Sequence, residues 1–177
     1  MKHNYLVSSI LATNIQLQRF IDHTYRNFTG LPTLKRSAIT PDLYLGGQYK
    51  IGSLHRLKEL GVTGIVNMRT RSIHKEAPQE IQVLHLSTTD LHAPTIENLQ
   101  KGVIFIQNNI DKGGKVYIHC RLGEGRGPSM ALAYLISKGL TLDHAIELIK
   151  KVRIFISPTQ EQLDQLKKFE TLTHLSL

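Results

Sequence analysis

The sequence predicts an α/β fold, a three-layer sandwich in which a central, mostly parallel sheet of four to five strands lies between layers of helices. Two observations predict this class: short β-branched runs alternate with segments of helical period, and glycine or proline residues separate them. The 177 residues, 41% of them hydrophobic, suffice for one domain with its own core. We therefore expect a single main domain.

Residues 4 to 26 have the spacing of an amphipathic helix. Its apolar positions are Leu6, Ile10, Leu17, Phe20 and Ile21. We expect residues 1–36, this helix and a connector, to pack on a domain formed by residues 37–177. A membrane-surface helix is disfavoured because the polar face is rich in Gln and Asn rather than Lys. No apolar run reaches the roughly 18 to 20 residues of a transmembrane helix.

The rest of the chain alternates strands and helices. Predicted strands are residues 38–40, 43–46, 62–68, 81–86 and 115–119. Predicted helices are residues 53–60, 96–110, 127–138, 142–152 and 158–174. Ser157, followed by Pro158, is the expected N-cap of the last helix. Lys150, Lys151 and Arg153 lie near a helix end, where we expect them to balance its dipole.

Charge and cysteine content narrow the classes of function. Lys and Arg number 22 against 14 for Asp and Glu, which gives a net charge of +8 and favours anionic partners. The absence of Trp argues against a base-stacking platform, so no nucleic-acid partner is expected. A single cysteine, Cys120, excludes an intrachain disulfide and a cysteine-cluster metal site. It fits a reducing compartment such as the cytoplasm, with export as the alternative.

A glycine-rich loop between a strand and a helix carries the chemistry. Residues 115–119 form a buried strand, Cys120 follows directly, and Arg126 stands at the start of a helix. Backbone N–H groups and the positive end of the helix dipole converge in such a loop, which makes it an anion site. A nucleotide-binding loop would need Lys and then Ser or Thr where Arg126 and Gly127 stand. A dinucleotide fingerprint has a different glycine spacing, and an inert buried thiol is the remaining alternative.

The pattern His119-Cys120-x5-Arg126 resembles the signature of cysteine-dependent phosphatases. Residues 39–169 resemble the dual-specificity branch of the protein tyrosine phosphatases, with supporting segments at residues 43–47, 64–68, 90–94 and 153–158. The resemblance implies hydrolysis of phosphomonoesters through a phosphocysteine, with no metal or organic cofactor. It assigns Cys120 as nucleophile and His119 as a supporting residue. It assigns the phosphate to Arg126 and the loop residues Arg121, Leu122, Gly123, Glu124 and Gly125.

The resemblance also implies an acid about thirty residues before the cysteine, and Asp90 matches in spacing and setting. A capping role for Asp90 ahead of Thr95 is the alternative. Asp111, the other upstream carboxylate, lies near a helix end and is expected to be solvated there.

One position departs from the family pattern. The residue after the signature arginine is usually Ser or Thr, whose hydroxyl helps sulfur to leave, but here it is Gly127. Slow breakdown of the phosphocysteine is therefore expected, unless Ser129 supplies the hydroxyl.

Phosphorylated proteins are the expected substrates. Phospholipids are the alternative, because Arg121 adds a cation to the loop, although Glu124 opposes it. Arg69 and Arg71 follow a strand at the ligand-binding edge and are expected either to hold a second acidic group or to be solvated loop residues. A phosphate-binding module with little turnover is a further alternative, motivated by Gly127.

Overall fold

The computed structural model describes residues 2–71 and 80–175, with side chains of the first helix described from residue 11. Four parallel strands form one sheet in the order β1-β4-β2-β3. Their bounds are Leu43–Gly46 (β1), Val62–Asn67 (β2), Gln82–His85 (β3) and Lys115–His119 (β4). The predicted α/β class and largely parallel sheet are confirmed.

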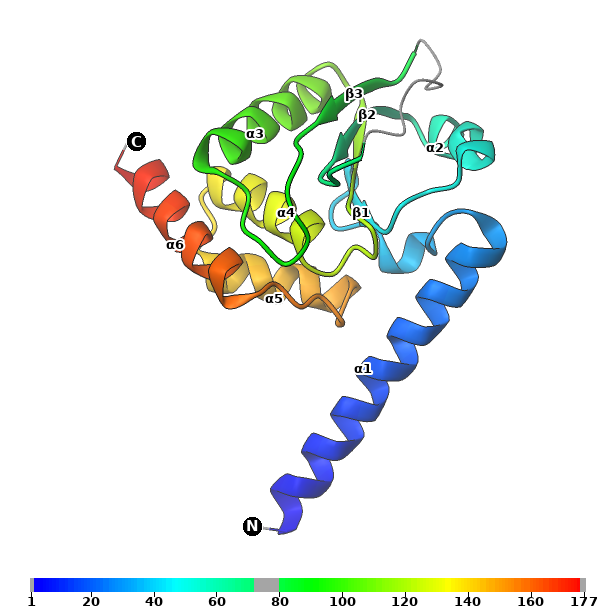
Figure 1. The fold of residues 1–177 in the computed structure, drawn as a ribbon, viewed down its shortest axis with the longest axis vertical. Coiled ribbons are helices and arrows are strands. Elements are labelled where there is room, and N and C mark those ends of the chain that lie inside the picture. Colours follow the sequence, from blue (N-terminus) through cyan, green and yellow to red (C-terminus); the bar gives the residue numbers. More distant parts are fainter. Residues whose placement is uncertain (1, 72–79, 176–177) are drawn as a thin grey trace.

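Helices cover both faces of this sheet, as Figure 1 shows. One face is covered by α3 (Ile96–Asp111), α4 (Arg126–Ser137), α5 (Leu142–Val152) and α6 (Gln160–His174). The other face packs on the short helix α2 (Leu54–Glu59). Two single-turn 3-10 helices, Leu34–Arg36 and Ile51–Ser53, flank that side. The carboxyl ends of all four strands lie at one edge of the sheet, where α/β proteins bind ligands.

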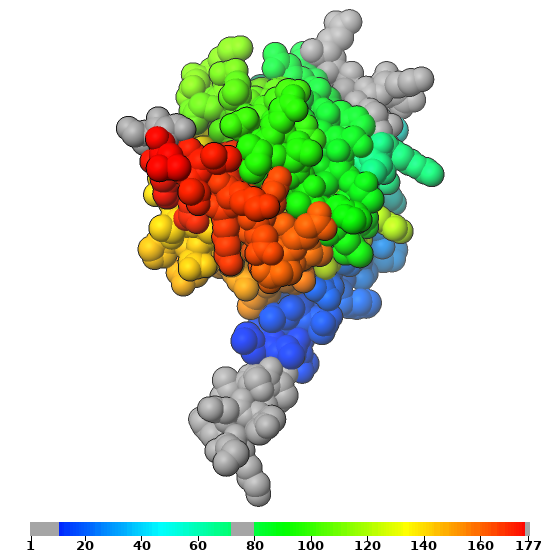
Figure 2. Space-filling view, turned by 60° about the vertical axis from the view of Figure 1, so that its left-hand side comes forward, coloured from blue at the N-terminus to red at the C-terminus, as the bar shows by residue number. Residues whose placement is uncertain are grey.

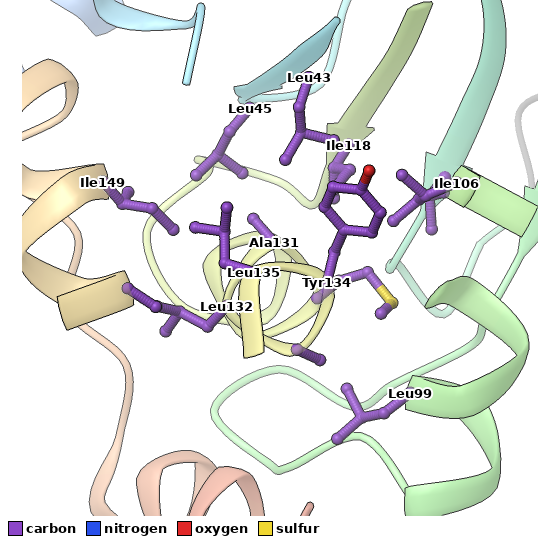
Figure 3. Close-up of a cluster of buried hydrophobic side chains, with 14 of the residues drawn as sticks. Leu43, Leu45, Leu99, Ile106, Ile118, Ala131, Leu132, Tyr134, Leu135 and Ile149 are labelled. Carbon is purple, nitrogen blue, oxygen red and sulfur yellow. The ribbon is translucent and has the colours of Figure 1, made fainter. Parts of the chain in front are cut away.

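Helix α4 is the centre of the main core. All of its residues from Arg126 to Ile136 are buried, because α3, α5 and α6 surround it and the sheet covers it. Figure 3 shows Ala131 and Leu135 of α4 beneath Leu43 and Leu45 of β1. The buried start of α4 is thereby fixed at the end of β4.

Two local expectations were wrong. Residues 38–40 form no strand, since only one isolated antiparallel bridge joins Ala38 to Tyr44. Helix α6 is capped by Thr159 instead of Ser157: the Thr159 hydroxyl accepts from the Gln162 N–H, and the Gln162 side chain accepts from the Thr159 N–H. The Ser157 N–H donates instead to the Glu124 carbonyl, 2.7 Å away.

The first helix, α1 (Lys2–Thr29), extends from the body of the protein (Figure 1), and its C-terminal half contacts the domain through side chains such as Arg19, Asp22 and Arg26. Figure 2 shows residues from 11 onward joining the lower edge of the domain. Leu17 and Phe20 are exposed by 55% and 67%, while Asp22 is fully buried. The helix therefore docks through polar side chains. Leu6 and Ile10 lie outside the described side chains.

Candidate active site

The loop of residues 120–125 joins the end of β4 to the start of α4 at the carboxyl edge of the sheet. Gly123 has a φ of +75°, which L side chains rarely adopt. A Cβ atom there would also lie 2.4 Å from the Gly46 carbonyl carbon. Glycine is therefore required at this position so that the loop can pass against the end of β1.

The backbone carbonyls of the loop are held on its outer side. Arg121 O accepts from the Gln48 N–H at 3.0 Å, and Glu124 O accepts from the Ser157 N–H at 2.7 Å. Gly125 O accepts from both the N–H and the hydroxyl of Ser129. Because its carbonyls are bound outside, the loop has N–H groups available on the inner side, and the Gly123 N–H donates to Cys120 Sγ at 3.2 Å.

Arg153 holds the two carbonyls in the middle of the loop. Its Nε donates to Gly123 O and its Nη2 to Leu122 O, each at 2.8 Å. The residue is completely buried, with its guanidinium 4.3 Å from the centre of the Phe155 ring. The expectation that Arg153 balances a helix dipole was wrong. The sequence does contain a signal of burial, because Arg153 directly precedes the apolar run Ile154-Phe155-Ile156.

The three residues assigned to catalysis by resemblance lie together. Cys120 and Arg126 are both nearly inaccessible to solvent. The Arg126 guanidinium donates through Nη1 to Thr88 O at 2.9 Å, and its Nη2 lies 2.8 Å from Asp90 Oδ1. The Asp90 side chain is itself 65% exposed. A carboxyl group and a guanidinium thus meet at the mouth of a loop that contains a thiol.

The Asp90 loop is anchored on the first turn of α6. The Thr159 hydroxyl donates to Leu91 O at 3.0 Å, and Gln162 Nε2 donates to His92 O at 2.9 Å. Leu91 has a φ of +66°, an uncommon conformation that turns the chain directly after Asp90. Asp111 lies at the C-terminal end of α3, beside the amino end of β4, and therefore at the opposite edge of the sheet.

Helix α1 also contacts the loop. Arg19 Nη2 and His23 Nε2 lie 3.3 and 3.0 Å from the carboxylate of Glu124. Asp22 Oδ2 accepts from Arg153 Nη2 at 3.0 Å. The expected opposition between Glu124 and Arg121 is therefore reduced, because the cation of Arg19 on α1 accompanies the Glu124 carboxylate.

His119 lies on the side of β4 away from the core cluster that contains Cys120. It is fully buried, and its ring is 5.2 Å from the Tyr49 ring and 6.0 Å from the Tyr117 ring, centre to centre. Its Nδ1 lies 3.2 Å from Cys120 O. This position suits a residue that orders the start of the loop.

Gly127 lies beside the sulfur. A Cβ atom at this position would be 3.6 Å from Cys120 Sγ, so the usual Ser or Thr hydroxyl of the family pattern would fall near the sulfur. The Ser129 hydroxyl donates to Gly125 O at 3.0 Å. Ser129 is thereby engaged with the backbone of the loop.

Several arginines gather around the loop. The register places Asn67 opposite His119, so Arg69 follows β2 beside the start of the loop. Arg69 Nη1 donates to the side chain of Gln48, which follows β1 on the other side of β4. Burial lowers the pKa of Arg69, and the neighbouring charges of Arg126, Arg121 and Arg71 lower it further. Arg69 therefore reaches across the end of β4 within a cationic cluster.

The fold and this arrangement define a cysteine-based phosphatase domain. A family model described as "Dual specificity phosphatase, catalytic domain" matches residues 43–172, and the chain belongs to that family. Among the described residues, no group of three or more His, Cys, Asp or Glu side chains is arranged to hold a metal ion. No described helix is both long and apolar enough to cross a membrane.

Two human proteins illustrate the relatives. Dual specificity protein phosphatase 1 is 31% identical over 135 residues, which cover 75% of this chain and 36% of that protein. The chain thus spans about a third of the length of the first curated relatives it matches. Phosphatidylglycerophosphatase and protein-tyrosine phosphatase 1 is 34% identical over 143 residues, which cover 74% of this chain and 71% of that protein.

Solved structures agree with this family. The crystal structure of PTPMT1 in complex with PI(5)P is similar with a TM-score of 0.72 and 30% identity, covering 78% of this chain and 96% of that one. Human DUSP28 shares the fold, with a TM-score of 0.74 and 24% identity, covering 80% of this chain and 99% of that one.

Proposed function

We propose that the protein is a phosphatase that hydrolyses phosphomonoesters through a phosphocysteine, with phosphotyrosine and phosphoserine or phosphothreonine in proteins as substrates. The observation that carries the proposal is the contact of Asp90 with Arg126 at the mouth of the loop that begins with Cys120. Family membership supports the same reaction.

In the first step, the Cys120 thiolate attacks phosphorus in line, an S–P bond forms, and the bond from phosphorus to the leaving oxygen breaks. Arg126 and the N–H groups of the loop stabilise charge on the three equatorial oxygens. Asp90, protonated at this stage, gives its proton to the leaving oxygen. The hydrogen bond from Arg126 to Thr88 O, which orients the guanidinium, supports this role.

In the second step, Asp90 is ionised and takes a proton from water, which attacks the phosphocysteine. The S–P bond breaks, inorganic phosphate leaves, and the thiolate is restored. The electron pair of the broken bond returns to sulfur. A hydroxyl at the position of Gly127 would stabilise that charge, so this chain is expected to perform the second step slowly.

Hydrolysis of an aryl phosphate tests the assignment. Cys120→Ser should abolish turnover, and Asp90→Asn should slow it at acidic to neutral pH by about 10²- to 10⁴-fold, the range for a positioned acid. The control is Asp164→Asn, a carboxyl group on α6 that accepts from Gln160 and lies outside the site. Wild-type activity in Cys120→Ser would refute the mechanism.

A phospholipid monoester is the second candidate substrate, favoured by the arginine cluster. Arg69, Arg71 and Arg121 offer charge beyond the one phosphate that the loop holds, and the Glu124 carboxylate is accompanied by α1. A lipid headgroup with a second acidic group would use this charge. A relative named as a phosphatidylglycerophosphatase and protein-tyrosine phosphatase supports this candidate, as does the crystal structure of PTPMT1 in complex with PI(5)P.

A substrate panel separates the two candidates. Phosphopeptides are set against phosphatidylglycerophosphate and phosphoinositides, in wild type and in Arg69→Gln. A protein phosphatase should prefer phosphopeptides, with little effect of Arg69→Gln on a singly phosphorylated peptide. A preference for lipid, lost at least in part in Arg69→Gln, would replace the first candidate with the second.

We also propose a reducing compartment such as the cytoplasm as the site of action. Cys120 has no second cysteine with which to form a protective disulfide. Activity after mild peroxide treatment should therefore return only with an added thiol, because a sulfenic acid and a backbone sulfenamide both need a reductant to restore the thiolate. Sustained activity in peroxide without any thiol would contradict this placement.

A further inference from the structure

Helix α1 contacts the loop of residues 120–125, the proposed phosphate-binding loop. The helix itself lies before the segment that the family model matches, residues 43–172. Arg19, Asp22 and His23 contact either the loop itself or the arginine that holds it. Among residues 11–29, Asp22 is the one buried side chain. The closest association of α1 with the domain is therefore made at the active site.

The contact of Asp22 passes directly to the loop through one guanidinium. Arg153 Nη2 donates both to Asp22 Oδ2 at 3.0 Å and to Leu122 O at 2.8 Å. Both side chains are fully buried, so a charge on either needs the other as its partner. Asp22 thus holds the guanidinium in the orientation that keeps the loop carbonyls outside and its N–H groups available inside.

Arg19 acts on the charge of the loop. Glu124 lies two residues before Arg126, in the segment whose N–H groups would face the phosphate. An unpaired carboxylate there would repel a phosphate dianion, whereas the cation of Arg19 at 3.3 Å offsets that field. The Glu124 side chain is only 18% exposed, so solvent screens the pair less than at an open surface.

Simple hydrophobic packing does not explain this docking. A helix that served only to cover the domain would turn its apolar side chains inward. In α1 Leu17 and Phe20 are exposed, and the docked face carries charges. Those charged residues contact Glu124 of the loop and Arg153, which binds the loop carbonyls.

We propose that α1 is a positioning element of the active site: Asp22 fixes Arg153 and through it the loop backbone, and Arg19 neutralises Glu124. The inference rests on the proposed function in that the loop binds a phosphoryl group. It goes further because it makes phosphate affinity depend on residues outside the family domain.

The test measures phosphate binding without turnover. Inorganic phosphate protects Cys120 from alkylation by iodoacetamide, and the half-protecting concentration reports affinity for the loop. If the wild type is protected but hydrolyses no substrate, the proposed function fails while the role of α1 is still measured. Steady-state KM and kcat for an aryl phosphate are recorded for the same variants.

Arg19→Gln should raise the half-protecting concentration and KM about two- to fivefold, the range of one partly exposed ion pair. In a Glu124→Gln background the same change should have no effect, since no carboxylate is left to neutralise. The control is Lys150→Gln, which removes one exposed cation from α5. Equal effects of Arg19→Gln in both backgrounds, or of Lys150→Gln and Arg19→Gln, would overturn the pairing.

Asp22→Asn keeps the size of the side chain and removes the charge that Arg153 needs. We expect kcat to fall and the half-protecting concentration to rise, each about tenfold, because the loop backbone is less firmly held. Both are measured at a temperature well below the melting temperature of the variant. Phe20→Ala, on the exposed face of α1, should change neither. An unaltered protection curve in folded Asp22→Asn would contradict the positioning role. If this variant does not fold, the comparison of Arg19→Gln in the wild-type and Glu124→Gln backgrounds tests the proposal by itself.

Discussion

Helices α4 and α1 both reach the phosphate-binding loop, and they do so with opposite chemistry. Helix α4 begins directly after this loop, and its residues Arg126 to Ile136 are all buried. Helix α1 presents Arg19, Asp22 and His23 to the loop and leaves Phe20 exposed. One helix is held by apolar burial on every side, the other by charge on one side. The loop is thus fixed from one end by packing and from outside by electrostatics.

Within these two helices, the largest effect is expected at the first residue of α4. Arg126→Lys should lower kcat/KM for an aryl phosphate by about 10²- to 10³-fold, because an ammonium group does not reproduce the planar fork on two phosphoryl oxygens. Steady-state kinetics measure this loss. Arg56→Lys is the control, since Arg56 lies on α2 and bonds to Thr29 O, outside the loop of residues 120–125. Comparable losses in the two variants would contradict the assigned role of Arg126.

Stability should separate the two helices. Leu135→Ala in α4 removes buried methyl groups and should lower the free energy of unfolding by about 2–5 kcal/mol. Phe20→Ala in α1 should change it by no more than about 0.5 kcal/mol, because that side chain is 67% exposed. Denaturant unfolding measures both values. A loss of several kcal/mol in Phe20→Ala would show that α1 packs through its apolar face.

A smaller effect is expected at the second residue of α4. Gly127→Ser places a hydroxyl near Cys120 Sγ, and its Cβ would meet Leu45 Cδ1 at 3.2 Å, a contact that a small shift relieves. Breakdown of the phosphocysteine should become a few-fold faster, about the effect of one neutral hydrogen bond. Rapid-mix kinetics should show an initial burst in the wild type that shrinks in the variant. No burst in the wild type would mean that Gly127 does not limit turnover.

The same comparison shows what local sequence can and cannot predict. The site around Cys120 was predictable because strand, glycines, Arg126 and helix follow each other along the chain, so their spacing carries the geometry. The helical period of α1 was also visible. Its docked face was not, because apolar spacing points to Leu17 and Phe20, whereas the partner surface offers Arg153 and Glu124.

Arg153 shows the limit most clearly. Its position near Lys150 and Lys151 suggested a cation at a helix end. In the structure, Arg153 lies against the loop of residues 120–125 and is completely buried. Its partners, Asp22 and Leu122, are 131 and 31 residues away along the sequence. Such contacts depend on the packing of whole elements. The apolar run beside Arg153 indicates burial, but local periodicity and spacing do not identify its partners.

Detection of phosphate on Cys120 tests the central claim most directly. The wild type is mixed with an aryl phosphate, quenched in acid within the first turnover and digested. The mass of the peptide that contains Cys120 is then measured by mass spectrometry. We predict a fraction of this peptide with one added phosphoryl group, absent in Cys120→Ser and larger when hydrolysis of the intermediate is slow. Product release in the wild type with Cys120 unmodified throughout the first turnover would contradict the account.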